Sequence, residues 1–404
     1  MPANKTHWPS LLILVIFGIS AVVLFLFSAG LGISSLVDLM AAGDNPAGQM
    51  IVAFAYGFEF LVLLLCSWFV LQRTMGREQA NLPFKFPYAE WQIFAVIGII
   101  MLSVLIGAVT AYTEFAWLTW LILPILTILV IVPPIWLLFG IGTKGIELGQ
   151  RWHVFTILGL SMTIGPMIMI VLELIVLAGI LVTGGVFIAI QQPVLFKELI
   201  RIGKILEQET NPDLILNLIA PYLKNPLVVG TAIGYIAVIV PLIEELFKPL
   251  AVWIFAKKLA SPAQGFAMGM LSGGAFALIE SLNASGDGST SWAVIVSIRA
   301  GTSLLHMTTS GLVGWGIAAA FNEKRVSRFF SAYFTSVSIH GIWNACAAGT
   351  SLSSFGESIG KPEWLINFIP ALLCGMLVLG IGMFAVLIAS NRKLQSSPHP
   401  QPIQ

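Results

Sequence analysis

Ten apolar runs, each long enough to cross a membrane, constrain this chain more than any other feature of its sequence. A helix needs about 20 apolar residues to span the hydrocarbon core of a bilayer. The runs cover residues 10–37, 49–71, 91–113, 116–140, 154–182, 227–256, 264–283, 293–320, 329–349 and 366–391. Charged residues make up only 10% of the chain, whereas soluble domains carry about 25%. We therefore predict an all-α polytopic membrane protein with about ten transmembrane helices.

The distribution of Lys and Arg predicts which side of the membrane each loop faces, because cytoplasmic loops carry an excess of these residues. With the N-terminus in the cytoplasm, the loops on that side hold 13 of the 20 cations: Lys5, Arg73, Arg77, Lys85, Lys144, Arg151, Lys257, Lys258, Lys324, Arg325, Arg328, Arg392 and Lys393. The opposite side holds Lys197, Arg201, Lys204, Lys224 and Lys361. We therefore predict that both termini lie in the cytoplasm.

The chain divides by composition into four predicted parts. They are a membrane region of about five spans (1–190), a polar extracytoplasmic connection (191–225), a second membrane region (226–391) and a short cytoplasmic tail (392–404). In the connection, apolar residues recur at steps of four, three and four from Leu195 to Leu206, which predicts an amphipathic helix at the membrane surface. A second short helix is predicted from Pro212, with Asn211 as its N-cap.

Ionisable residues gather in the second membrane region, although a charge at the bilayer centre costs about 2.5–3.5 kcal/mol even on the mildest insertion scale. Four successive spans carry Glu244, Glu245 and Lys248; Glu280; Arg299 and His306; and His340 with Asn344. The first region has only Glu59 and Glu173, which we interpret as single carboxyl groups that are protonated or hydrogen-bonded in helix interfaces. The concentration in one region predicts a shared interior cavity.

The segment PLIEELFKPL carries the densest charge. Glu244 and Lys248 are four residues apart, so they can face the same way and partly neutralise each other, while Glu245 points about 100° away. Pro241 and Pro249 each remove a backbone hydrogen bond. Membrane helices tolerate such breaks where neighbouring groups or water satisfy the freed backbone. We predict a helix that opens towards a wet cavity.

The next span has a repeat of small residues. Gly265, Gly269 and Gly273 recur every four residues, which predicts a close contact with another helix. From Gly273, the face continues through Phe276 and Glu280. This spacing indicates that the span presents its polar residues in a narrow band.

Two kinds of hydrolytic chemistry suit these side chains. A carboxylate can take a proton from water with histidine sharing it, and an Asn can donate to a developing oxyanion, which is typically worth about 2.7–4 kcal/mol. Alternatively, two His and a Glu can hold zinc while a further Glu acts as base. The chain has no HExxH motif, no pair of intramembrane Asp residues and no serine with a visible base and orienting group. These absences disfavour the corresponding protease classes.

The order of the motifs resembles the PrsW family of intramembrane proteases. The sequence has EELFK (Glu244, Glu245, Lys248), FALIE (Phe276, Glu280), His306 and HGIWN (His340, Asn344), one on each of four successive spans. The matched stretch is about 226–350. The family is similar in turn to the CAAX-type prenyl endopeptidases, but Lys248 replaces their Arg and Glu280 their His, which favours PrsW.

The resemblance implies roles for six residues. Glu244 and Glu245 would activate water, Asn344 would stabilise the oxyanion, His306 and His340 would assist as base partners or ligands, and Lys248 would balance the charge of the Glu pair. Glu280 completes the candidate catalytic set. Whether the enzyme holds zinc or no cofactor stays open; the candidate metal ligands are Glu280, His306 and His340.

The resemblance also implies a substrate and a location. The enzyme would be an endopeptidase of a bacterial cytoplasmic membrane that cleaves a membrane-anchored protein, as in site-1 cleavage of an anti-sigma factor. Its partners would be that substrate and the lipid bilayer, without nucleic acid. Two alternatives stay open. A proton- or cation-coupled transporter is disfavoured because the halves show no inverted repeat, and a non-catalytic scaffold because none of the four motifs is degraded.

Overall fold

The computed structural model describes residues 7–43, 45–113, 115–209, 211–223, 225–354 and 367–395. Within these ranges the chain is helical, and the only extended pairing is an isolated bridge between Pro83 and Gln150. The predicted all-α fold is confirmed. The cations Lys5, Lys224 and Lys361 and residues 396–404 of the predicted tail lie outside the described residues, and the predicted orientation of the termini stays a prediction.

Nine helical segments of the described residues are long and apolar enough to cross a membrane. They are Trp8–Met40, Pro46–Thr74, Gln92–Tyr112, Ala116–Thr143, Arg151–Gln191, Val228–Lys258, Pro262–Asn283, Trp292–Asn322 and Ile369–Gln395. The tenth predicted span, 329–349, lies in α14 (Val326–Ser354), which has 29 residues. Its length suffices, but the polar side chains that include His340 and Asn344 lower its hydropathy. The protein is an integral membrane protein.

The helices form two compact units. Unit 1 comprises Met1–Pro166, Glu245–Ser336 and Gly382–Gln404, and unit 2 comprises Met167–Glu244 and Val337–Ile381. The boundaries fall inside four helices, among them α10 (Val240–Phe247) and α14. These units are defined by contacts, so the predicted division of the sequence into four consecutive parts stays a prediction.

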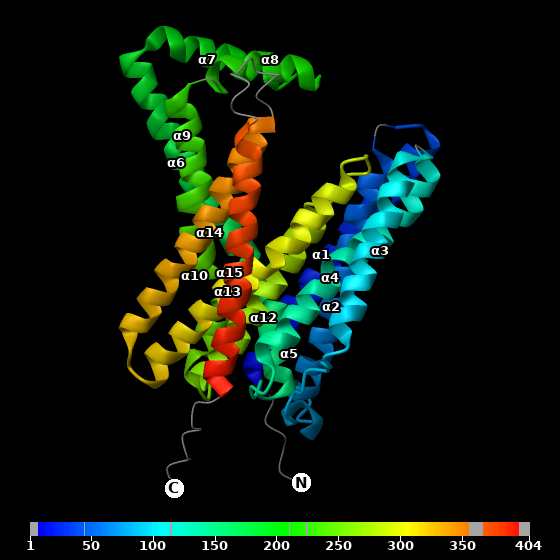
Figure 1. The fold of residues 1–404 in the computed structure, drawn as a ribbon, viewed down its shortest axis with the longest axis vertical. Coiled ribbons are helices and arrows are strands. Elements are labelled where there is room, and N and C mark those ends of the chain that lie inside the picture. The colour runs from blue at the N-terminus through cyan, green and yellow to red at the C-terminus, as the bar shows by residue number, and fades with distance from the viewer. Residues whose placement is uncertain are drawn as a thin grey trace. The chain divides into compact units, whose positions relative to one another are not determined.

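Unit 1 begins with two helical hairpins. α1 (Trp8–Met40) packs along α2 (Pro46–Thr74), and α3 (Gln92–Tyr112) along α4 (Ala116–Thr143), as Figure 1 shows. A short 3-10 helix, η1 (Glu78–Asn81), follows α2, and α5 (Arg151–Met162) packs against α2 and α12. α1 begins and α15 (Ile369–Gln395) ends at the same end of this unit (Figure 1).

The close contact predicted from the glycine repeat is confirmed by α12 (Pro262–Asn283) and α13 (Trp292–Asn322) of unit 1. A Cβ atom on Gly269 would lie 2.2 Å from the carbonyl oxygen of Ser310, and one on Gly273 would lie 2.2 Å from that of His306. Only glycine allows the two backbones to approach this closely. The contact thereby fixes the register between Glu280 on α12 and His306 on α13.

Unit 2 contains the surface helices. α6 (Ile164–Gln191), most of which belongs to this unit, follows a break at Thr163, so the long predicted span 154–182 consists of two helices. α7 (Pro193–Leu206) and α8 (Pro212–Leu223) then connect α6 to α9 (Pro226–Gly234), as Figure 1 shows. The amide nitrogen of Leu214 donates to the Asn211 side chain over 3.4 Å. The amphipathic helix and the Asn211 cap are confirmed.

The predicted span 227–256 is broken on both sides of its charged residues. A π-helical turn, η2 (Tyr235–Ile239), precedes α10, and Lys248 and Pro249 separate α10 from α11 (Leu250–Phe255). A 3-10 turn, η3 (Ala256–Lys258), ends the segment. The predicted interruption at the two prolines is confirmed.

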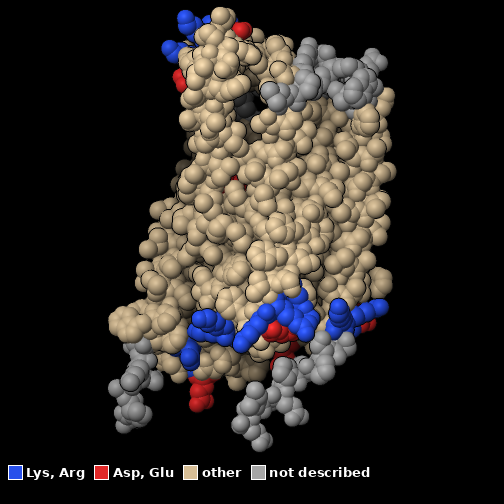
Figure 2. Space-filling view, turned by 90° about the vertical axis from the view of Figure 1, so that its left-hand side faces the viewer, with Lys and Arg blue, Asp and Glu red and all other residues tan. Residues whose placement is uncertain are grey.

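Cations gather along one edge of the surface in Figure 2. In unit 1, the chain positions that carry them are the ends of α2 and α15, the α4–α5 and α13–α14 connections, and η3. Because successive helices of a bundle alternate in direction, these positions share one side. This gathering is typical of the cytoplasmic side of a membrane protein.

Candidate active site

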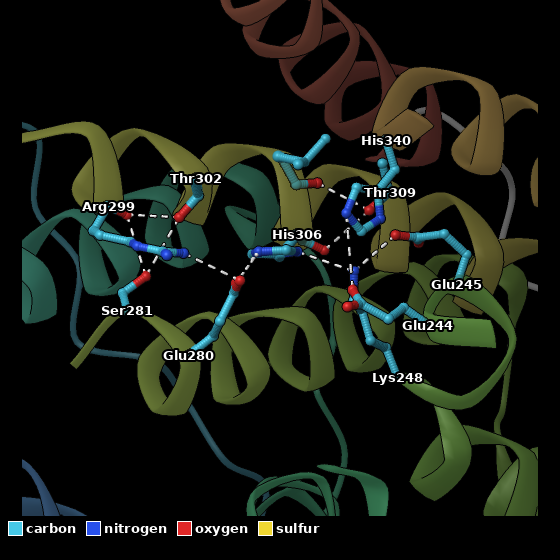
Figure 3. A network of polar contacts seen from close by, with 11 residues as sticks. Glu244, Glu245, Lys248, Glu280, Ser281, Arg299, Thr302, His306, Thr309 and His340 are labelled. Carbon is cyan, nitrogen blue, oxygen red and sulfur yellow. Dashed lines mark hydrogen bonds and ion pairs between the residues drawn. The ribbon is translucent and has the colours of Figure 1, made fainter. Parts of the chain in front are cut away.

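The contact between α12 and α13 places Glu280 between two partners. Nη1 of Arg299 lies 3.1 Å from one carboxylate oxygen of Glu280, and Nε2 of His306 lies 2.7 Å from the other (Figure 3). The side chains of Glu280 and Arg299 are partly exposed, whereas His306 is buried. Each carboxylate oxygen therefore has its own partner, and the imidazole is held in a fixed orientation.

Lys248 connects the same histidine to the glutamate pair. Its Nζ lies 2.8 Å from Oε1 of Glu245 and 3.0 Å from Nδ1 of His306 (Figure 3). It also lies 4.8 Å from the centre of the Phe276 ring, a favourable place for a cation. The side chains of Lys248 and Glu245 are both fully buried. The oxygen, the nitrogen and the ring together stabilise a charge that would otherwise be costly in the membrane.

The geometry indicates which nitrogen of His306 carries the proton. A lysine ammonium has only donors, so the nitrogen next to it, Nδ1, must accept. Nε2 then carries the proton and donates to Glu280. The result is a continuous chain of Glu245, Lys248, His306, Glu280 and Arg299, in which two cations balance two carboxylates around a neutral imidazole.

Lys248 pairs with Glu245, three residues before it. α10 ends at Phe247, and Lys248 lies in the turn before α11. The contact of Lys248 with Glu244 that the four-residue spacing predicts stays a prediction.

Hydroxyl groups hold the broken backbone in place. Oγ of Ser272 donates to the backbone carbonyl of Lys248 over 2.5 Å. Oγ of Ser161 lies 2.6 Å from Oγ of Ser272, and since the Ser272 proton is already used, Ser161 is the donor. The turn at Lys248 is thus fixed by α12 and α5 of unit 1.

Unit 2 holds the remaining predicted residues. Oε2 of Glu244 lies 3.8 Å from Nε2 of His340, and both side chains are largely buried. Nδ2 of Asn344 donates to the backbone carbonyl of Ile236 over 3.1 Å. In a π-turn this carbonyl would accept from residue 241, but Pro241 has no N–H. Asn344 therefore supplies the missing donor.

Unit 1 thus brings together Glu245, Lys248, Glu280 and His306, and unit 2 brings Glu244 to His340. Arg299 is a costly residue within a span to which none of the sequence motifs assigns a role. Two observations indicate such a role. An intramembrane arginine requires a partner, and Arg299 lies seven residues, about two helical turns, before His306, so both face the same side of α13.

The interpretation of Glu59 is confirmed by its partner. Nδ2 of Asn283 donates to Oε1 of Glu59 over 2.8 Å, and Glu59 is buried between α2 and α12. Asn283 lies three residues after Glu280 on α12, so the polar band of this helix continues into an interface contact. For Glu173, the hydroxyl group of Tyr235 donates to its backbone carbonyl.

Comparison with known protein families shows to which family the chain belongs. The family described as PrsW family intramembrane metalloprotease matches residues 169–372, half of the chain. The match starts inside the fifth predicted span and includes α7 and α8, so it extends beyond the stretch 226–350 that carries the motifs. Comparison with curated proteins and with solved structures gave no match. The chain belongs to the PrsW family of intramembrane metalloproteases.

Proposed function

We propose that this protein is an intramembrane endopeptidase in which Glu244, Glu245, Glu280, His306, His340 and Asn344 carry the reaction and Lys248 balances their charge. The family is one of intramembrane proteases. The observation that carries the assignment of residues is the buried chain from Glu245 through Lys248 and His306 to Glu280. A structural helix interface has no need of a fully buried carboxylate and ammonium, which are expensive in a membrane.

The two adjacent glutamates take different roles in this proposal. Glu245 is bound to the Lys248 ammonium, so its negative charge is fixed and it positions Lys248 against His306. Glu244 faces the imidazole of His340, and its side chain is 12% exposed whereas that of Glu245 is fully buried. A general base must reach water, which favours Glu244 as the group that takes the proton and later delivers it to the leaving amine.

Asn344 is the proposed donor to the oxyanion. One proton of its amide group is used by the carbonyl of Ile236, which fixes the orientation of the side chain. An amide NH2 group has two protons, so the second can stabilise the negative charge that develops on the carbonyl oxygen of the substrate. The π-turn at Pro241 thereby contributes to the position of a catalytic donor.

The donor chemistry of the chain fits a metal ion in part. In a metal-dependent mechanism Glu244, His306 and His340 would hold the ion, with Glu244 as a ligand instead of the base, since one carboxylate and two imidazoles form the ligand set of many catalytic zinc sites. Both oxygens of Glu280 are engaged, so it suits the orienting carboxylate of a ligand histidine better than the ligand role expected from the sequence. His306 could bind through Nδ1 only after the Lys248 ammonium leaves it. A bound metal would polarise the scissile carbonyl and activate water.

We further propose that the substrate is a membrane-anchored regulatory protein, such as an anti-sigma factor, cleaved on the extracytoplasmic side of a bacterial cytoplasmic membrane. The support is the resemblance of the motifs and the predicted orientation. The cation edge of unit 1 would face the cytoplasm, and α7 and α8 would lie at the outer surface.

The test compares new protein N-termini in membranes that contain the wild type, Glu244→Gln/Glu245→Gln or the control Glu78→Gln/Glu90→Gln. The control removes two exposed carboxylates from the surface. We expect cut sites near the outer ends of membrane anchors with the wild type and the control, and none with the first variant. Identical profiles for all three folded proteins would instead favour a transporter or a scaffold. Metal content measured for His306→Ala, His340→Ala and Glu280→Gln separates ligands from the orienting carboxylate.

A further inference from the structure

A group of cations surrounds Trp152 at the end of unit 1 that carries the cation edge. Cζ of Arg73, at the end of α2, lies 5.4 Å from the centre of the Trp152 ring, and Nζ of Lys258, in η3, lies 6.0 Å from it. The ring of His7, just before α1, lies 5.9 Å away in an edge-on arrangement. Nζ of Lys258 also lies 5.5 Å from the ring of Phe255. Three separate segments thus converge on one buried indole.

The positive charge of this group is not balanced by carboxylates of the described residues. Arg73 donates to the neutral side chain of Asn81, and Lys258 makes no ion pair in this part of the chain. Other cations on the same side form ion pairs with carboxylates: Lys144 pairs with Glu90, and Arg325 and Arg328 pair with Glu323. Residues 1–6 and 396–404 contain no Asp or Glu.

The pKa of His7 is consistent with the positive charge of the cations near it. Burial, together with the nearby cations Arg73 and Lys258, holds the pKa of His7 below its ordinary value. The His7 imidazole, whose Nδ1 lies 2.7 Å from Oγ of Ser10, is therefore mostly neutral at pH 7. The charge available to a ligand comes from the guanidinium and the ammonium groups.

The surroundings favour a lipid headgroup over a small free anion. α1 starts directly after His7, and Trp8 and Leu12 in its first turns are 73% and 64% exposed. These side chains form an apolar surface next to the cations, where acyl chains of a lipid would lie. Clusters of Lys and Arg on the cytoplasmic side attract anionic lipids, and guanidinium groups bind phosphate well.

We propose that Arg73 and Lys258, held over Trp152, form a binding site for the phosphate group of an anionic phospholipid in the cytoplasmic leaflet. Arg73 would contribute hydrogen bonds and Lys258 a compact point charge. The Trp152 ring fixes the separation of the two cations, and the acyl chains would lie against the start of α1. This site is independent of the proposed proteolytic residues.

The test is native mass spectrometry of the full chain in detergent with phosphatidylglycerol or with phosphatidylcholine of the same acyl chains. Removal of one cation at a membrane surface is expected to weaken binding of the anionic lipid roughly fivefold, and removal of two roughly 25-fold. We therefore compare Arg73→Gln/Lys258→Gln with the control Arg77→Gln/Lys85→Gln, which removes an exposed Arg and an exposed Lys from the same side.

We expect the wild type and the control to prefer phosphatidylglycerol equally and the first variant to lose that preference. Equal binding of the two lipids to the wild type, or equal losses in both variants, would overturn the proposal. Displacement of the lipid by inorganic phosphate at low concentration would assign the site to a free anion and also refute it. If Arg73→Gln/Lys258→Gln fails to fold, the single variant Lys258→Gln tests the proposal. It is expected to fold, because Lys258 is exposed and makes no ion pair among the described residues.

Discussion

Lys248 offers the most direct test of the buried charge chain. Its ammonium and the carboxylate of Glu245 are 2.8 Å apart, and both side chains are fully buried. Removal of one partner of such a pair leaves an uncompensated buried charge, which typically costs about 3–5 kcal/mol. We expect Lys248→Met and Glu245→Gln each to lower the free energy of unfolding by about this amount. The double variant should lose much less than the sum of the two single losses, because it has no charge left to bury.

Cys66 provides the assay. It is fully buried in the core of unit 1, the unit that contains Lys248 and Glu245. With Cys346 and Cys374 replaced by Ser, reaction of Cys66 with a thiol-specific dye reports the opening of this core. Its dependence on denaturant concentration gives the free energy of unfolding of each variant.

An exposed ion pair serves as the control. Nζ of Lys144 lies 2.5 Å from Oε1 of Glu90, but both side chains are largely exposed. We expect Lys144→Met to cause no measurable change, because solvent screens such pairs. The reasoning is refuted if Lys248→Met is as stable as the wild type, or if the double variant loses the full sum of the single losses. Either result would mean that burial of the pair does not determine its energy.

Three further predictions concern packing and positioning. Gly273→Ala should lower the free energy of unfolding by about 1–3 kcal/mol through overpacking and should reduce protease activity. At Gly301 a Cβ atom meets no atom within 4 Å, so Gly301→Ala should change neither quantity. The thiol-reaction assay and the N-terminus assay measure the two effects. Arg299→Gln should reduce kcat with little change in KM, and Arg299→Lys should restore part of kcat, since a cation still faces Glu280. Asn344→Ala should reduce both kcat and the free energy of unfolding when it is made in the wild type. In a Pro241→Ala background, residue 241 has an N–H that can donate to the carbonyl of Ile236, so Asn344→Ala should reduce kcat alone.

The fold was largely predictable because lipid imposes one rule on every span. Backbone groups in the hydrocarbon core must be bonded within the segment, so long apolar runs become helices. Pro166 is a local signal for a kink in the span 154–182, which divides at Thr163. The two compact units were not visible in the sequence, because they depend on contacts between distant segments, such as the packing of α5 on α12.

The polar contacts of the site were less predictable than its composition. The glycine repeat predicted the helix contact that sets Glu280 against His306, because its period is regular. The four-residue spacing did not indicate the pairing of Lys248 with Glu245, because a spacing rule assumes an unbroken helix and Pro249 interrupts it. The role of Arg299 depends on the register of α12 against α13, which the sequence does not contain.

The two prolines explain why the polar band of these spans mixes structural and chemical groups. At each break a side chain from another helix donates to a backbone carbonyl: Asn344 donates to Ile236, whose π-turn partner would be Pro241, and Ser272 donates to Lys248, which lies between α10 and α11. These donors stabilise the breaks, and the breaks present Glu244, Glu245 and Lys248 outside the regular helical pattern. A polar residue in such a band is therefore not by itself evidence of catalysis. Its partner decides, and a side chain that bonds only a carbonyl freed by proline is expected to affect stability first.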